Sequence, residues 1–321
     1  MRLAKYSIIT LGLILLGATA SPRGLACGDD DVRTIKIPGT PYYGRLHGDL
    51  FLCVCDKDRL LAVDLKREKV TELGSARKRW YDGDVRDGRL LMIEQDKIRE
   101  VALDAGKTLR EITLADPQVR AFGFAGKDRV FVHRGNAVEI LDLDSAKVVH
   151  RIELAKEGWT HAATPWQRIG HRLITPGPAT TLCIIDLDAG TLVERFSVDA
   201  RNGITNLYVE GGVAFCSGSP FAWGARTDHI TSVDLETGKN RIVDVQAQTR
   251  GAIRFARGPF GNVYLMSQKR IDRVNVEGEL LASVNVDPNQ QPLGIWRQKL
   301  LVAGKNEIRL VDITETRVAR R

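Results

Sequence analysis

Residues 185–190 read Ile-Asp-Leu-Asp-Ala-Gly, and residues 233–238 read Val-Asp-Leu-Glu-Thr-Gly. In both stretches a β-prone run ends in aliphatic-Asp-aliphatic, a polar turn follows, and a second β-prone run begins after the glycine. An Asp that opens a tight turn hydrogen-bonds the turn backbone through its side chain, and Gly adopts the positive φ that the turn requires. The repeated Asp therefore has a structural explanation, and each copy predicts a β-hairpin.

This pattern recurs along most of the chain. Its aliphatic-Asp-aliphatic centre, or a close variant, begins at seven positions: Val63, Val101, Leu141, Ile185, Val233, Val274 and Val311. Successive copies lie 37 to 48 residues apart. Four short antiparallel strands need about 40 to 45 residues, which is the period of a propeller blade. The sequence therefore predicts an all-β fold, a seven-bladed β-propeller of four-stranded antiparallel blades.

Each unit divides into four expected strands, a to d. In the third unit we expect strands at Val119–Phe124, 129–133, 137–143 and 148–154. The last unit ends with residues 317–321, which leave room for only a short strand d. Residues 32–37 have the alternation of a further strand d, so we expect them to pair into the seventh blade. Pairing of N-terminal and C-terminal strands would close the ring and remove the exposed edges that make open sheets prone to association.

Composition and length limit the classes of protein to which this chain can belong. The 321 residues are 43% hydrophobic and 27% charged, with a net charge of +7. These values exclude a disordered chain, a collagen and a small disulfide-dense protein. Length alone suggests two domains, whereas the repeats predict one propeller domain over residues 32–321. No internal apolar run reaches the roughly 18 residues that a membrane-spanning helix needs.

The first 31 residues are expected to lie outside the propeller. An apolar run at residues 7–20 follows Arg2 and Lys5, and it ends in the small residues that signal peptidase requires, Ala18-Thr19-Ala20. We therefore expect a signal peptide over residues 1–20, a flexible segment over residues 21–31, and an exported protein, periplasmic or extracellular. A lipid anchor at Cys27 is the alternative, although lipid-attachment sequences carry Leu where this chain has Gly24.

The sequence contains an odd number of cysteines: Cys27, Cys53, Cys55, Cys183 and Cys216. Export permits disulfides, but five cysteines leave at least one thiol unpaired. Cys53 and Cys55 are two residues apart on an expected strand, so they point the same way and are poorly placed to bridge each other. We interpret the cysteines as buried thiols and predict no metal site, because further ligands at suitable spacing are not evident.

The repeat unit, Val-Asp-Leu with a Gly-containing turn and a following Ile-x-Val strand, resembles the YVTN and quinoprotein-like β-propeller repeats. The resemblance covers nearly all of the chain after residue 20 and is specific to architecture rather than activity. WD40 repeats fit less well, because their Gly-His and Trp-Asp dipeptides are absent from the expected places. The resemblance implies that ligand sites lie on the face that carries the b–c and d–a loops, around the central funnel.

Two connections on that face are unusually long. Residues 217–228 form the fifth b–c loop, and residues 155–161 form a neighbouring d–a connection. Long loops on a rigid scaffold are where function concentrates, and aromatic rings with Arg suit a pocket for a small organic or peptide ligand. Packing between blades at the funnel rim is the alternative interpretation of these aromatic residues. The predicted ligand-binding residues are Tyr43, Trp80, Tyr81, Trp159, Trp223, Arg226 and Arg250.

Catalytic signatures are weak. The sequence lacks the His-Glu-x-x-His zinc motif, the Gly-x-Ser-x-Gly nucleophile elbow and a phosphate-binding glycine loop. We therefore predict an exported, non-catalytic propeller that binds a protein partner or a small ligand, as a scaffold or accessory subunit. The alternative is a lactonase-like hydrolase or lyase that acts at the funnel through His161 and His229.

Cofactors and partners follow from the same motifs. No cofactor is identified, because the Cys-x-x-Cys-His haem site is missing. A variant of the non-catalytic hypothesis is a subunit of a periplasmic amine-dehydrogenase-like complex, whose large subunits resemble this chain in size and blade number; the redox cofactor would then sit on another chain. Nucleic acid is not an expected partner, because the basic residues are scattered rather than arranged in a stripe.

Overall fold

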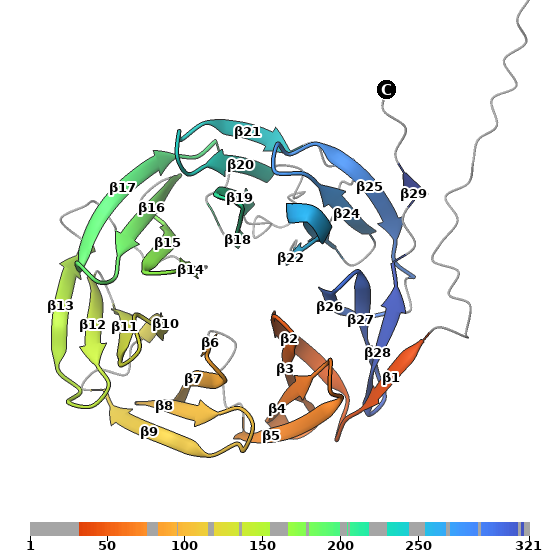
Figure 1. The fold of residues 1–321 in the computed structure, drawn as a ribbon, viewed down its shortest axis with the longest axis horizontal. Helices are drawn as coiled ribbons and strands as arrows, with labels where there is room; N and C mark the ends of the chain where they lie inside the picture. Colours follow the sequence, from red (N-terminus) through yellow and green to blue (C-terminus); the bar gives the residue numbers. More distant parts are fainter. Residues whose placement is uncertain are drawn as a thin grey trace, which may run out of the picture.

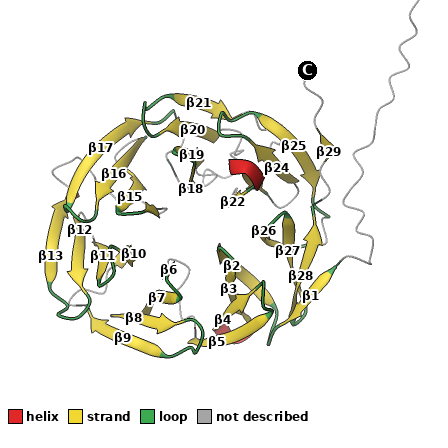
Figure 2. Ribbon diagram, in the orientation of Figure 1, coloured by secondary structure: helices red, strands yellow, loops and turns green. Residues whose placement is uncertain are grey.

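The computed structural model describes residues 32–75, 83–94, 96–114, 119–134, 137–154, 166–177, 180–199, 204, 206–217, 230–243, 254–267, 270–287, 290–313 and 316–317. These residues form seven antiparallel sheets arranged as the blades of a ring (Figure 1). Strands account for most of them, and the helical elements include single 3-10 turns at Asp56–Asp58 and Pro259–Gly261 (Figure 2). The predicted seven-bladed β-propeller is confirmed.

Blades 1 to 6 follow chain order from the ring centre outwards (Figure 1). Blade 1 contains β2 (Pro41–His47), β3 (Leu50–Cys55), β4 (Arg59–Asp64) and β5 (Lys69–Ser75); blade 2 contains β6 (Asp84–Arg86), β7 (Arg89–Glu94), β8 (Lys97–Ala102) and β9 (Thr108–Thr113). Blade 3 contains β10 (Val119–Phe124), β11 (Arg129–Arg134), β12 (Ala137–Asp142) and β13 (Val148–Glu153); blade 4 contains β14 (Gln167–Ile169), β15 (Arg172–Pro176), β16 (Thr181–Asp186) and β17 (Thr191–Ser197). Blade 5 contains β18 (Asn206–Glu210), β19 (Val213–Ser217), β20 (Ile230–Asp234) and β21 (Asn240–Val243).

The last two blades include strands from the chain ends. Blade 6 contains β22 (Arg254–Arg257), β23 (Val263–Met266), β24 (Arg270–Val274), β25 (Leu280–Asn285) and the short β29 (Thr316–Arg317). Blade 7 contains β26 (Pro292–Trp296), β27 (Lys299–Gly304), β28 (Glu307–Asp312) and, outermost, β1 (Arg33–Lys36). Within the described residues, no helix is long and apolar enough to cross a membrane.

The N-terminal strand closes the ring as the sequence predicts. β1 pairs antiparallel with β28, with Arg33 opposite Leu310 and Lys36 opposite Glu307. Ile35 and Ile37 are 2% and 5% exposed and join a hydrophobic cluster shared by blades 7 and 1. The first strand of the domain therefore completes its last blade.

The C-terminal strand lies elsewhere than expected. The sequence assigned residues 317–321 to the outer edge of the last unit, but Thr316 and Arg317 pair with Ser283 and Ala282 of β25 in blade 6. The physical reason is that β1 already occupies the free edge of β28 in blade 7. β29 therefore adds a fifth strand to the neighbouring blade, and the rest of the predicted strand, residues 318–321, lies outside the described residues.

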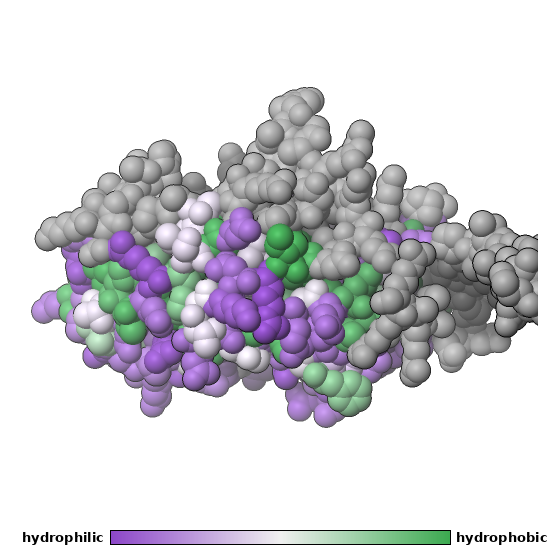
Figure 3. Space-filling view, turned by 90° about the horizontal axis from the view of Figure 1, so that it is seen from above, coloured by the Kyte–Doolittle hydropathy of each residue, from purple (hydrophilic) through white to green (hydrophobic). Residues whose placement is uncertain are grey.

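Hydrophobic side chains fill the contacts between blades. Seven buried clusters are present among the described residues, and each is shared by two adjacent blades. The central strands of a blade place side chains in the hydrophobic contacts with both neighbouring blades. Both of their faces are therefore buried, which explains nearly continuous apolar runs such as Leu50–Cys55. The outer surface seen edge-on is mainly hydrophilic where it is described (Figure 3).

The cysteines belong to these buried layers. Cys53, Cys55, Cys183 and Cys216 are all buried and form no disulfide among the described residues, whereas Cys27 lies outside them. Burial raises the pKa of the Cys216 thiol to about 12, so this thiol is protonated at neutral pH. The interpretation as buried thiols is confirmed for these four residues.

The repeated Asp plays the turn role that the sequence predicted. Oδ1 of Asp186 accepts hydrogen bonds from the backbone N–H groups of Asp188 and Ala189, both at 2.9 Å. Backbone hydrogen bonds of this kind lower the carboxyl pKa at three of the repeated positions, Asp142, Asp186 and Asp234. Each Asp therefore holds the turn between strands c and d of its blade.

Closure by β1 gives a first testable prediction. We expect Ile35→Asp to lower the free energy of unfolding by about 3 kcal/mol or more, because an unpaired carboxylate would enter the core between blades 7 and 1. Urea denaturation followed by tryptophan fluorescence measures the loss. The matched control is Thr34→Asp, one residue away and exposed, which should change stability by no more than about 0.5 kcal/mol. Equal losses in the two variants would contradict closure through Ile35.

The turn geometry gives a second prediction. Ala146 adopts φ 56° at the position where other copies place Gly190 and Gly238, with φ 66° and 70°. A side chain in this left-handed region costs roughly 1 kcal/mol, so we expect Ala146→Gly to stabilise the fold by about 0.5–1 kcal/mol. Thermal unfolding measures the gain. Ala189→Gly, one residue before the corresponding glycine, should instead destabilise, and stabilisation by both changes would argue against the left-handed strain.

Candidate functional site

Strand direction fixes which connections share a face of the ring. Neighbouring strands within each blade are antiparallel, so the b–c and d–a connections leave from one face and the a–b and c–d turns leave from the other. Of the predicted ligand-binding residues, Tyr43 on β2 lies in the described part of the chain. The other predicted site residues lie outside it: Trp80, Tyr81, Trp159, His161, Trp223, Arg226, His229 and Arg250.

Side chains from blades that are not adjacent meet at the axis of the ring. The guanidinium of Arg254 on β22 in blade 6 lies over the ring of Tyr43 in blade 1, 5.7 Å from its centroid. The guanidinium of Arg45, also on β2, lies over the ring of Trp166, which immediately precedes β14 of blade 4, at 5.8 Å. Such contacts between non-adjacent blades form across the centre of the ring, where the innermost strands converge (Figure 1).

Asp84 joins blades 2, 3 and 4 at the same place. Its Oδ2 accepts hydrogen bonds from the backbone N–H of Phe124 in blade 3 at 3.0 Å and from Nε of Arg168 in blade 4 at 3.3 Å. Asp84 itself belongs to β6 of blade 2 and is 8% exposed. A buried carboxylate is stable only when it is paired in this way.

A glycine makes this close approach possible. A Cβ atom at Gly123 would lie 2.7 Å from the side chains of Phe131 and Trp166 and 3.1 Å from Oδ2 of Asp84. Trp166 also packs edge-on against Phe131, with ring centroids 4.8 Å apart. We name the group of side chains that meets here the axial cluster: Tyr43, Arg45, Asp84, Trp166, Arg168 and Arg254.

The innermost strands are strongly biased towards arginine. Strands β2, β6, β10, β14, β18, β22 and β26 together contain six arginines, two carboxylates and no lysine. The arginines are Arg45, Arg86, Arg120, Arg168, Arg254 and Arg257, and the carboxylates are Asp84 and Glu210. Arginine differs from lysine in presenting a planar fork of donors that stacks on aromatic rings and binds carboxylate or phosphate in two places. The axis therefore carries a net positive charge with donors suited to anions.

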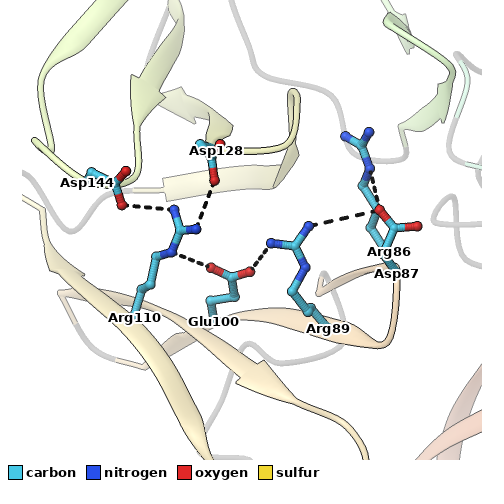
Figure 4. A network of polar contacts seen from close by, with 7 residues as sticks. All are labelled: Arg86, Asp87, Arg89, Glu100, Arg110, Asp128 and Asp144. Carbon is cyan, nitrogen blue, oxygen red and sulfur yellow. Dashed lines mark hydrogen bonds and ion pairs between the residues drawn. The ribbon is translucent and has the colours of Figure 1, made fainter.

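Some of these arginines are engaged away from the axial cluster. Nε of Arg86 lies 3.3 Å from Oδ2 of Asp87 in an a–b turn, and this pair begins a network that continues through Glu100 to blade 3 (Figure 4). Glu100 is 1% exposed and contacts Arg89 at 2.6 Å and Arg110 at 3.4 Å. The network joins the turns of blades 2 and 3 on the a–b face, and its role is structural.

The histidine beneath the cluster carries no charge at neutral pH. His47 ends β2, two residues after Arg45, and its Nε2 atom is buried without a hydrogen-bond partner among the described residues. Burial, and then the positive charge of Arg45, lower the pKa of His47 to about 3. The positive charge at the axis therefore belongs to the arginines.

Rim residues nearby join one blade to another. The Tyr42 hydroxyl donates a hydrogen bond to Oδ1 of Asp58 at 3.0 Å, and Nε2 of Gln291 in the connection before β26 donates to the Tyr42 carbonyl at 3.3 Å. Packing at the funnel rim thus accounts for Tyr42. Within the described residues, no group of three or more His, Cys, Asp or Glu side chains is placed to hold a metal ion.

Comparisons with known proteins support the architecture. The chain is similar to the β-propeller domain of Myceliophteria thermophila Cps50 (Swd1), with 18% identity and a TM-score of 0.63 over 88% of this chain and 99% of that one. It is also similar to the computationally designed protein Ika8, with 12% identity and a TM-score of 0.58 over 87% of this chain and 98% of that one. No family model and no curated protein matches the sequence. At these identities the likeness shows the fold alone.

Sequence reasoning found one member of the axial cluster, Tyr43, and missed the other five. The sequence-based search gave most weight to loop residues, whereas Arg45, Asp84 and Arg168 lie on innermost strands. A usable signal was present, because the first strand of several repeat units contains arginine where a half-buried strand would normally carry apolar residues. Comparison of the seven units strand by strand would have revealed it.

The Asp84 contacts give a third prediction. We expect Asp84→Ala to cost about 3 kcal/mol of stability, because it leaves the Phe124 N–H and the Arg168 guanidinium without their shared acceptor. Equilibrium denaturation measures this cost. Asp87→Ala is the matched control: Asp87 pairs with Arg86, but its side chain is 73% exposed, so the loss should stay below about 1 kcal/mol. A small loss for Asp84→Ala would show that the carboxylate does not hold the three blades together.

Proposed function

We propose that this chain is an exported binding module that holds a partner or ligand on its b–c and d–a face and does not itself catalyse a reaction. In this role the chain is a scaffold or an accessory subunit. Export rests on the signal-peptide pattern of residues 1–20. The resemblance of its repeats to quinoprotein-like propellers supports a role beside a periplasmic redox protein that carries the cofactor.

One observation carries the proposal. In the axial cluster, three arginines and two aromatic side chains converge from blades 1, 4 and 6, and a single carboxylate is present to balance them. Propellers of ordinary composition could fill this position with apolar side chains, which would cost less than bringing like charges together. Excess positive charge held beside buried and half-buried aromatic rings is typical of binding sites rather than of a core.

A photo-crosslinking experiment tests which face binds. A photoreactive phenylalanine analogue replaces Trp223, in the connection between β19 and β20, and in a second protein replaces Phe260, which is 98% exposed in the a–b turn of blade 6. The connections that contain the two positions leave their described strands at opposite faces of the ring. After irradiation in the native host, we expect adducts from position 223 in the exported fraction, on a protein shortened by its first 20 residues.

The other outcomes are equally informative. Adducts from position 260 alone, or from neither position, would contradict binding on the b–c and d–a face.

The competing hydrolase interpretation is checked with the purified protein in a lactone and ester screen. Turnover that disappears in the His161→Ala, His229→Ala double variant would overturn the non-catalytic assignment.

A further inference from the structure

We propose that the axial cluster binds a small organic anion, a carboxylate or a phosphate ester, through Arg45 and Arg254. This inference deepens the proposed function, and rests on it, by naming the chemical class of the ligand. It is based on the ion pairs of the innermost-strand arginines: some arginines are paired with a carboxylate, and others are not.

Three innermost-strand arginines are paired. Arg86 contacts Asp87 at 3.3 Å, Arg168 contacts Asp84 at 3.3 Å, and Arg257 contacts Glu210 at 3.2 Å. Both carboxylates of the innermost strands are used in these pairs. Two arginines with described side chains remain, Arg45 and Arg254. Neither lies within 4.0 Å of a carboxylate among the described residues.

Aromatic rings hold the two remaining guanidinium groups. A cation over an aromatic face is stabilised by roughly 0.5–2 kcal/mol, and stacking leaves the N–H donors at the edge of the guanidinium plane free. Trp166, beneath Arg45, is 8% exposed, so its ring is a fixed platform. The aromatic contacts therefore orient both arginines without neutralising their charges or occupying their donors.

The two arginines act on the same region. Tyr43 and Arg45 are two residues apart on β2, in the regular part of its pairing with β3, so their side chains project from the same side of the strand. Arg254 reaches the same pair of residues from blade 6 by lying over Tyr43. Alternate residues of a strand are only about 7 Å apart, so we infer that one small molecule reaches both guanidinium groups.

A partly buried guanidinium without a carboxylate partner among the described residues, as at Arg45, is unfavourable unless an anion joins it. Arg45 is partly buried and Arg254 is exposed, so a ligand that enters from solvent meets Arg254 and Tyr43 first. The lowered pKa of His47 agrees with a positive potential around Arg45. A polyanion such as nucleic acid would need a positive surface that extends beyond this cluster, whereas these arginines converge at the ring axis. The occupant is therefore a small anion.

Titration calorimetry of the full exported protein at low ionic strength tests the inference, with citrate and inorganic phosphate as anionic probes and glucose as the neutral comparison. We expect saturable binding of at least one anion and none of glucose. Arg45→Gln and Arg254→Gln should each weaken that binding at least about 10-fold, since each removes a charge-assisted pair of hydrogen bonds. Preference for citrate identifies a carboxylate ligand, and preference for phosphate identifies a phosphate ester.

The control is Arg241→Gln, which removes an exposed arginine from β21, the outermost strand of blade 5, and should leave the affinity unchanged. Arg45→Lys keeps the charge but loses the planar fork, so it should bind more weakly even where Arg45→Gln is too unstable to purify. No saturable anion binding, or equal affinity in wild type and both glutamine variants, would overturn the inference. If crosslinking at position 223 still succeeds, the binding module stands and only the ligand class is wrong.

Discussion

Burial of both faces of every sheet is the constraint on which this protein depends. A blade of four strands exposes apolar side chains on two sides, and each side is covered only when a neighbouring blade packs against it. Such a unit cannot bury its core alone, so stability requires a complete ring. This explains why the short strand β1 matters more than its four residues suggest, since it supplies Ile35 to the contact between the last blade and the first.

Closure also creates the axis, and the axis has different chemistry from the contacts between blades. The blades meet through aliphatic and aromatic side chains, whereas the innermost strands bring arginines together at the centre. Some of these charges are neutralised locally, as in the contacts of Asp84 with Arg168 and with the backbone of Phe124. Others rest on aromatic rings and keep their charge. The scaffold thus holds positive groups in fixed positions, which favours binding because little ordering is required when a ligand arrives.

Fold similarity contributes little to the question of function. The likeness to the Swd1 propeller domain, at 18% identity, establishes how the chain folds. Propellers host many unrelated activities, so function must be argued from the residues of this chain. Those residues are a central cluster of Arg and aromatic side chains on the described strands and the long b–c and d–a connections recognised in the sequence.

The sequence by itself determined the number of blades, the strand boundaries of the third unit to within one residue, the Asp-opened turns and the closure by residues 32–37, because all of these depend on local patterns. A hydrophobic alternation with Asp and Gly at fixed offsets specifies a hairpin wherever it occurs. The tertiary structure decided the rest. The C-terminal strand joined blade 6 because β1 already covered the edge of blade 7. Arg45 lies over Trp166 and Arg254 lies over Tyr43 although these partners are far apart in the sequence, because only ring closure brings the innermost strands of blades 1, 4 and 6 to a common axis.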